Sequence, residues 1–225
     1  MFNLTIFREL VTAALWTGLL AGLLLTAIQQ IEVIPTLHKA EVYEEMATAL
    51  THKDDSHQAN EWRPENGLKR TLFTAMANIS LGVGFALLMG SIMLVRGRPE
   101  QWRNGLLWGL AGYLSIFVAP SLGLPPEVPG TAAANLEDRQ TWWLLTVLDT
   151  GFGLWLMAFA KTRTNQFFGA VLLFAPHLIG APQPEVHSSA APTELVKTFI
   201  TATAYANAIF WLAIGGLMGR FYKKH

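Results

Sequence analysis

The chain has 225 residues, of which 52% are hydrophobic and only 14% are charged, and it contains no cysteine. A soluble domain carries about 25% charged residues, so this composition indicates a membrane protein. The absence of cysteine excludes disulfides, thiolate metal sites and cysteine nucleophiles, and the formal net charge of zero gives no electrostatic footprint for a nucleic-acid partner.

The first apolar block runs from about residue 10 to residue 34, long enough to cross a hydrocarbon core of roughly 30 Å. It is too long for a signal peptide and has no small-residue cleavage site, so we expect a retained helix. Gly18 and Gly22 form a small-residue face suited to close helix packing. Pro35 lacks a backbone N–H, and we expect it to end this helix.

Residues 36–70 form the one sizeable polar segment, which we expect on the extracytoplasmic side between the first two helices. A short helix over residues 37–51 is predicted, with four apolar residues on one face: Val42, Met46, Ala49 and Leu50. Imidazoles and carboxylates share a neighbouring narrow arc: His38, Glu41, Glu45 and His52. Such groups can gather a divalent cation, although the pattern favours the alternative of a solvated polar face.

Five further apolar blocks follow, at about residues 72–95, 106–122, 142–160, 166–179 and 196–217. Six spans with both termini inside place every basic turn on the cytoplasmic side, as the positive-inside bias requires: Arg96 to Arg103, Lys161 to Arg163, and Arg220 to Lys224. The block at 166–179 is short and contains Pro176, so five spans remain the alternative. We therefore predict an all-α integral membrane protein of six transmembrane helices, forming a single membrane domain over residues 1–225.

Two proline-rich segments close apolar blocks, and they read APSLGLPPEVPG at 119–130 and APHLIGAPQPEV at 175–186. The runs before them also correspond, GVGFALLM at 82–89 and GFGLWLM at 151–157. We interpret the pattern as a duplicated helical hairpin, about 72–128 and 142–186, in which each copy ends in a cap with one carboxylate, Glu127 or Glu185. Pseudo-symmetric hairpins would place both carboxylates at one outer vestibule, as an entry site for a cation. Equally, each could merely hydrate a rigid turn.

Two residues inside the apolar blocks are candidates for chemistry. Asp149 lies near the middle of its block, where a charged residue costs about 2.5–3.5 kcal/mol, so we prefer a role on an ion path to a structural hydrogen bond. His177 follows Pro176, whose missing N–H frees carbonyl oxygens that could help coordinate an ion; a hydrogen-bonded core histidine is the equal alternative. Four other intramembrane polar residues are predicted to form interhelical hydrogen bonds: Asn78, Ser80, Tyr205 and Asn207.

No GxxxxGK[ST], HExxH, GxSxG or CxxC motif is present, so the chemistries of those motifs have no support. Three classes of function remain. The chain could conduct a metal ion, it could be a non-conducting assembly or scaffold subunit of another membrane complex, or it could be a membrane enzyme with Asp149 and His177 as acid and base. A catalytic pair would need hydrogen-bond or one-water reach.

Several segments together resemble the CbtA family of probable cobalt transporter subunits, over essentially the whole chain. They are Gln29-Gln30 at the end of the first span, Glu41 to Glu44, the cap at 120–130, Arg139-Gln140 before Trp142-Trp143, and residues 175–182. The resemblance implies a bacterial inner-membrane protein linked to cobalt supply for cobalamin synthesis, and a small single-span partner, CbtB, with a histidine-rich metal-binding end. The family is usually described with five spans.

The resemblance implies no ligand set, so the candidate metal ligands come from the residues alone. Imidazole and carboxylate suit Co²⁺, and equally Ni²⁺ or Zn²⁺. We expect a permeation subunit for such a cation, without enzymatic activity and with no cofactor beyond the transported ion. The non-conducting subunit is the alternative.

Overall fold

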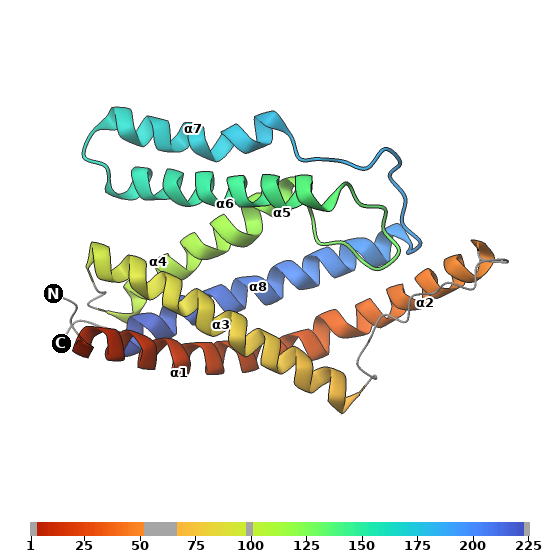
Figure 1. Cartoon of the computed structure of the whole chain (residues 1–225), viewed down its shortest axis with the longest axis horizontal. Helices are drawn as coiled ribbons and strands as arrows, with labels where there is room; N and C mark the ends of the chain where they lie inside the picture. The colour runs from red at the N-terminus through yellow and green to blue at the C-terminus, as the bar shows by residue number, and fades with distance from the viewer. Residues whose placement is uncertain (1–3, 52–66, 98–100, 223–225) are drawn as a thin grey trace. The chain divides into compact units, whose positions relative to one another are not determined.

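The computed structural model describes residues 4–51, 67–97 and 101–222 (Figure 1). Its elements in chain order are α1 (Leu4–Ile28), the π-helical turn η1 (Gln29–Val33), α2 (Ile34–Thr51), α3 (Leu68–Arg96), α4 (Trp102–Tyr113), the π-helical turn η2 (Leu114–Val118), α5 (Ala119–Gly123), α6 (Leu136–Phe159), α7 (Arg163–Ile179) and α8 (Thr193–Phe221).

Within these described residues, five helices are long and apolar enough to cross a membrane: Leu4–Leu50, Leu68–Arg96, Trp102–Gly123, Leu136–Phe159 and Thr193–Phe221. The sixth, α7, has 17 residues, which corresponds to about 25 Å at 1.5 Å per residue. The chain is therefore an all-helical, multi-pass membrane protein, as predicted.

The first helix does not end at Pro35, and that prediction was wrong. The helix is continuous from Leu4 to Leu50, and a π-helical turn lies directly before the proline. In this turn the N–H of Ile34 bonds to the carbonyl of Gln29, one residue further back than in an α-helix. The wider turn relieves the clash between a proline ring and the preceding turn, so the helix can continue.

The same device occurs a second time, before Pro120. The turn η2 ends at Val118, and the N–H of Ala119 bonds to the carbonyl of Leu114. Pro120 then lies within the helix that continues through α5 to Gly123. The first proline-rich cap thus begins as helix and becomes extended only after Gly123.

The contacts of the chain divide it into two compact units. Unit 1 comprises residues 1–35, 52–110 and 205–225, and unit 2 comprises residues 36–51 and 111–204. In unit 1, α1 and α3 pack through small residues, as Gly18 and Gly22 predicted. A methyl group on Gly82 would lie only 2.9 Å from the carbonyl oxygen of Gly18. Gly105 of α4 packs in the same way against the backbone of α8 at Gly215.

Unit 2 is built on the hairpin of α6 and α7, which lie side by side and antiparallel (Figure 1). Gly153 and Gly169 permit the close approach, because a methyl group on either would lie 2.7 Å from the carbonyl oxygen of the other. The corresponding glycines of the first hairpin behave differently. Gly82 packs against α1, and Gly84, the counterpart of Gly153, has nothing within 4 Å of an added methyl group. Gly84 therefore makes no close helix contact of the kind that Gly153 makes.

Candidate functional site

The two proline-rich caps lie against each other in unit 2. An antiparallel bridge joins Thr131 and Ser189, with the N–H of Ala132 bonded to the carbonyl of Ser188 at 2.9 Å and that of Ala190 to the carbonyl of Gly130 at 3.0 Å. Gly130 adopts a positive φ of 72°, which favours glycine. The repeated caps thus form one structure at one end of the α6–α7 hairpin, and the shared vestibule stays a prediction.

The pairing of the caps also bears on the number of spans. The first cap leads into α6 and the second leads out of α7, so both ends of this hairpin lie on the same side. Because α6 crosses the membrane, α7 must return across it to reach the second cap. This geometry favours six crossings, although α7 is shorter than the other five helices.

The two cap carboxylates have different surroundings. Glu127 accepts a hydrogen bond from Arg139 at 2.7 Å in an ion pair whose side chains are only 29% and 25% exposed. Glu185 is exposed, and nearby His187 contacts the side-chain oxygen of Gln183 at 3.3 Å. Glu127 therefore links the first cap to the start of α6, whereas Glu185 is exposed to solvent.

His177 lies beside Trp142 at the same end of the hairpin. The indole N–H of Trp142 donates to the carbonyl of Pro176 at 3.2 Å, and the indole and imidazole rings meet edge to face at 6.0 Å. Trp142 and Trp143 begin the block at 142–160, a position typical of interfacial tryptophans, but Trp142 is only 7% exposed, whereas Trp143 is 39% exposed. The helix α7 runs through Pro176 to Ile179, so the proline does not break it.

Asp149 is half-buried on α6, two turns from Trp142. Within the described residues, its carboxylate has no hydrogen-bond or ion-pair partner. Thr150 beside it is 3% exposed, with a buried hydroxyl that also lacks a partner there. Seven residues of helix place Asp149 about 10 Å along α6 from the level of Trp142 and His177. An acid–base pair of Asp149 and His177 therefore has no geometric support.

On α2, neither the polar arc nor the apolar face is the buried side, which instead includes Thr36 and Ala40. Ala40 is fully buried, and the Nε2 atom of His38 is buried without a partner among the described residues. Glu41 is half-buried and Glu45 is exposed, while His52 lies outside the described residues. The apolar side chains are largely exposed: Val42 47%, Met46 58% and Leu50 86%.

The sequence is similar to a known protein family. The sequence matches the CbtA family, described as a probable cobalt transporter subunit, over residues 7–223. The chain belongs to the CbtA family. No curated protein and no solved structure matches it.

The candidate ligands of this CbtA-family chain do not form one cluster. Among residues 4–51, 67–97 and 101–222, no group of three or more histidine, aspartate or glutamate side chains is placed to hold a metal ion. The caps bring together the segments of Glu127 and Glu185, but Asp149 stands apart on α6. Their roles as metal ligands stay predictions.

Sequence reasoning missed most of a polar seam between η1 and α3 in unit 1. The side-chain amide of Asn78 donates to Thr26 at 3.0 Å and to Gln29 at 2.7 Å, and Gln30 donates to Thr71 at 3.0 Å. The interhelical role predicted for Asn78 is confirmed. In the sequence, this seam was indicated by two adjacent glutamines shortly before a proline. A π-helical turn at such a site changes which side chains face the neighbouring helix.

Proposed function

We propose that this CbtA-family protein is the permeation subunit through which a divalent transition-metal cation, Co²⁺ in the first place, enters the bacterial cytoplasm for cobalamin synthesis. The observation that carries the proposal is the family match over residues 7–223. The cation is the transported substrate, and the proposal requires no enzymatic step.

The route proposed for the cation begins at the paired caps. Glu185, exposed beside His187, would meet the ion first. His177 lies at the same end of the hairpin, and Asp149 would then receive the ion within the membrane. An unpartnered carboxylate on a spanning helix supports this step, since such groups normally mark ion pathways.

A path of separated ligands is compatible with transport. Conduction requires binding favourable enough for entry and weak enough for release. Single carboxylate and imidazole groups, completed by water and backbone carbonyls, would satisfy both conditions. The proposed topology has both termini in the cytoplasm and residues 36–70 outside the inner membrane. Glu41, Glu45 and His38 of α2 would then collect cations near the entry.

The exposed apolar face of α2 supports contact with another subunit. Val42, Met46 and Leu50 recur at every fourth residue and remain uncovered in the single chain. The family description also names a subunit, which implies partners. A small single-span partner of the CbtB type, with metal-binding histidines, fits this requirement. The same observation favours the second candidate function, a non-conducting assembly subunit.

Radiolabelled cobalt accumulation separates the two candidates. Cells without other cobalt importers would express the chain alone, with the small partner, or neither, and the membrane level of the protein would be measured in parallel. Accumulation above the empty control supports permeation, and competition by Ni²⁺ or Zn²⁺ gives the selectivity. No accumulation in either case, with normal protein levels, would favour the assembly subunit.

A further inference from the structure

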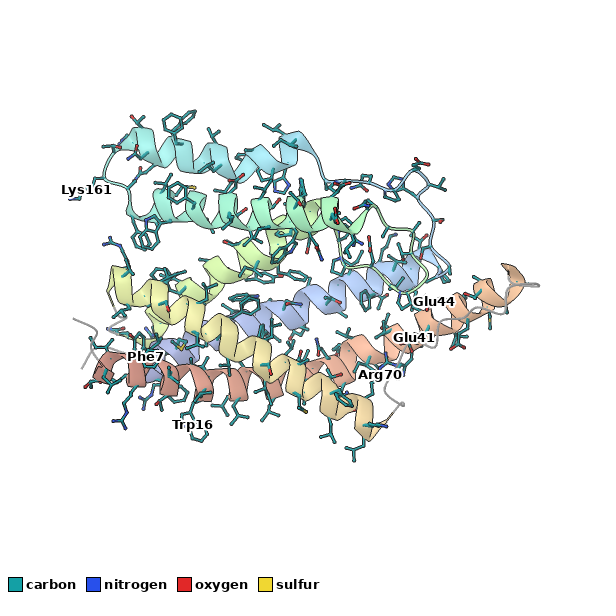
Figure 2. All side chains as sticks on the ribbon, viewed as in Figure 1. Phe7, Trp16, Glu41, Glu44, Arg70 and Lys161 are labelled. Atoms are coloured by element: carbon teal, nitrogen blue, oxygen red, sulfur yellow. The ribbon has the colours of Figure 1, made fainter. Side chains whose placement is uncertain are left out.

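A groove of about 430 Å³ lies in unit 1 along the first turns of α1, away from the cap residues. Its lining comes mainly from one side of α1, at Thr5, Arg8, Glu9, Thr12 and Trp16. Phe221 of α8 closes the groove. Trp16 is 56% exposed, and Figure 2 shows it on the side of α1 opposite α3. The groove therefore opens toward the surroundings of the helix pair.

Polarity changes along this groove. Arg8 and Glu9 directly precede the apolar block that begins at Leu10, so they lie at the depth of lipid headgroups. Trp16 is eight residues beyond Arg8, about 12 Å deeper at 1.5 Å per residue. Arg8 is exposed and has no partner among the described residues. A ligand that fills the groove must have a charged head and an apolar body.

We infer that the groove binds one phospholipid with a zwitterionic, amine-bearing headgroup. The guanidinium of Arg8 offers several N–H donors to phosphate oxygens, and Thr12, one turn further along α1, adds a hydroxyl on the same side. Glu9 supplies a negative charge to the same groove, which matches the ammonium of a phosphoethanolamine head. Trp16, about 12 Å deeper than Arg8, packs along the acyl chain.

Lipid-dependent quenching of the fluorescence of Trp16 tests the inference. The full chain is placed in nanodiscs that contain a small fraction of phospholipid with brominated acyl chains, carrying either an ethanolamine or a glycerol headgroup. The fluorescence of Trp16 is obtained as the difference between the fluorescence of the wild type and that of Trp16→Phe. The expected result is quenching of Trp16 well above that for random lipid contact, greater for the ethanolamine lipid than for the glycerol lipid.

Arg8→Gln should reduce the enrichment of both lipids on the order of tenfold, since it removes the charge-assisted phosphate contact. Glu9→Gln should abolish the preference between the two headgroups. Arg163→Gln, an exposed arginine at the start of α7 outside the groove, is the matched control and should change nothing. Thermal unfolding confirms that each variant is folded.

Two results would overturn the inference. Quenching that follows the bulk lipid fraction in both the wild type and Arg8→Gln would mean that the groove has no bound lipid. Displacement of the brominated lipid by millimolar inorganic phosphate would mean that the site recognises free phosphate and not a lipid.

Discussion

The hydrogen bonds of Asn78 should contribute measurably to the packing of α1 against α3. Asn78 is 8% exposed, and its amide joins Thr26 and Gln29 across the helix interface. An interhelical hydrogen bond in a membrane protein contributes about 0.6 kcal/mol on average and at most about 1.7 kcal/mol. Asn78→Leu, which keeps the number and branching of the side-chain heavy atoms, should therefore lower the free energy of unfolding by about 1.2 kcal/mol for the two bonds together.

A double-mutant cycle isolates the stronger contact. Asn78→Leu, Gln29→Leu and the double variant are unfolded reversibly in bicelles, and the coupling energy expected for the 2.7 Å bond is about 0.6–1.7 kcal/mol. Ser91→Ala is the control, because the Ser91 hydroxyl is exposed and bonds to Leu87 of its own helix. A coupling below about 0.3 kcal/mol would refute the reasoning, because independent sites add to within that margin.

Four further substitutions test the packing and the caps. Gly153→Ala should destabilise the protein, because the new methyl group would lie 2.7 Å from a facing backbone carbonyl, whereas Gly84→Ala, with open space, should be neutral or raise the melting temperature. Glu127→Gln removes the ion pair with Arg139 and should cost up to about 1 kcal/mol of stability; a loss of cobalt uptake at unchanged stability would instead mean that Glu127 is a ligand. Gly130→Ala should lower the melting temperature because of its positive φ, and an unchanged value would show that the paired caps tolerate strain.

The spans were predictable because block length and hydrophobicity are local properties of the chain. The block predicted at 72–95 is α3, Leu68–Arg96, and that at 142–160 is α6, Leu136–Phe159. The predicted blocks are shorter because polar end residues such as Lys69 and Glu137 continue a helix beyond its apolar core. The two similar caps lie against each other, although Glu127 is paired with Arg139 and Glu185 is exposed; the duplication of the hairpin stays a prediction.

The errors arose where a neighbouring helix overrides a local rule. By the local rule, Pro35 should end the helix. The π-helical turn before it lets the helix continue, and Gln29 and Gln30 of this turn form hydrogen bonds to α3. Trp142 lies at the edge of an apolar block, as interfacial tryptophans do, but the carbonyl of Pro176 on α7 supplies its hydrogen bond inside the protein. Neither partner is visible from the residues adjacent in sequence.

The central claim is that a cation crosses the membrane past Asp149. The most direct test is Co²⁺ flux into liposomes that contain the purified chain with its small partner, comparing the wild type with Asp149→Asn and with Asp138→Asn. Asp138 is an exposed carboxylate in the first turn of the same helix, so its variant controls for the loss of one negative charge. We predict that Asp149→Asn abolishes flux while Asp138→Asn retains it. Equal flux in all three proteins would contradict the claim and remove Asp149 from the path.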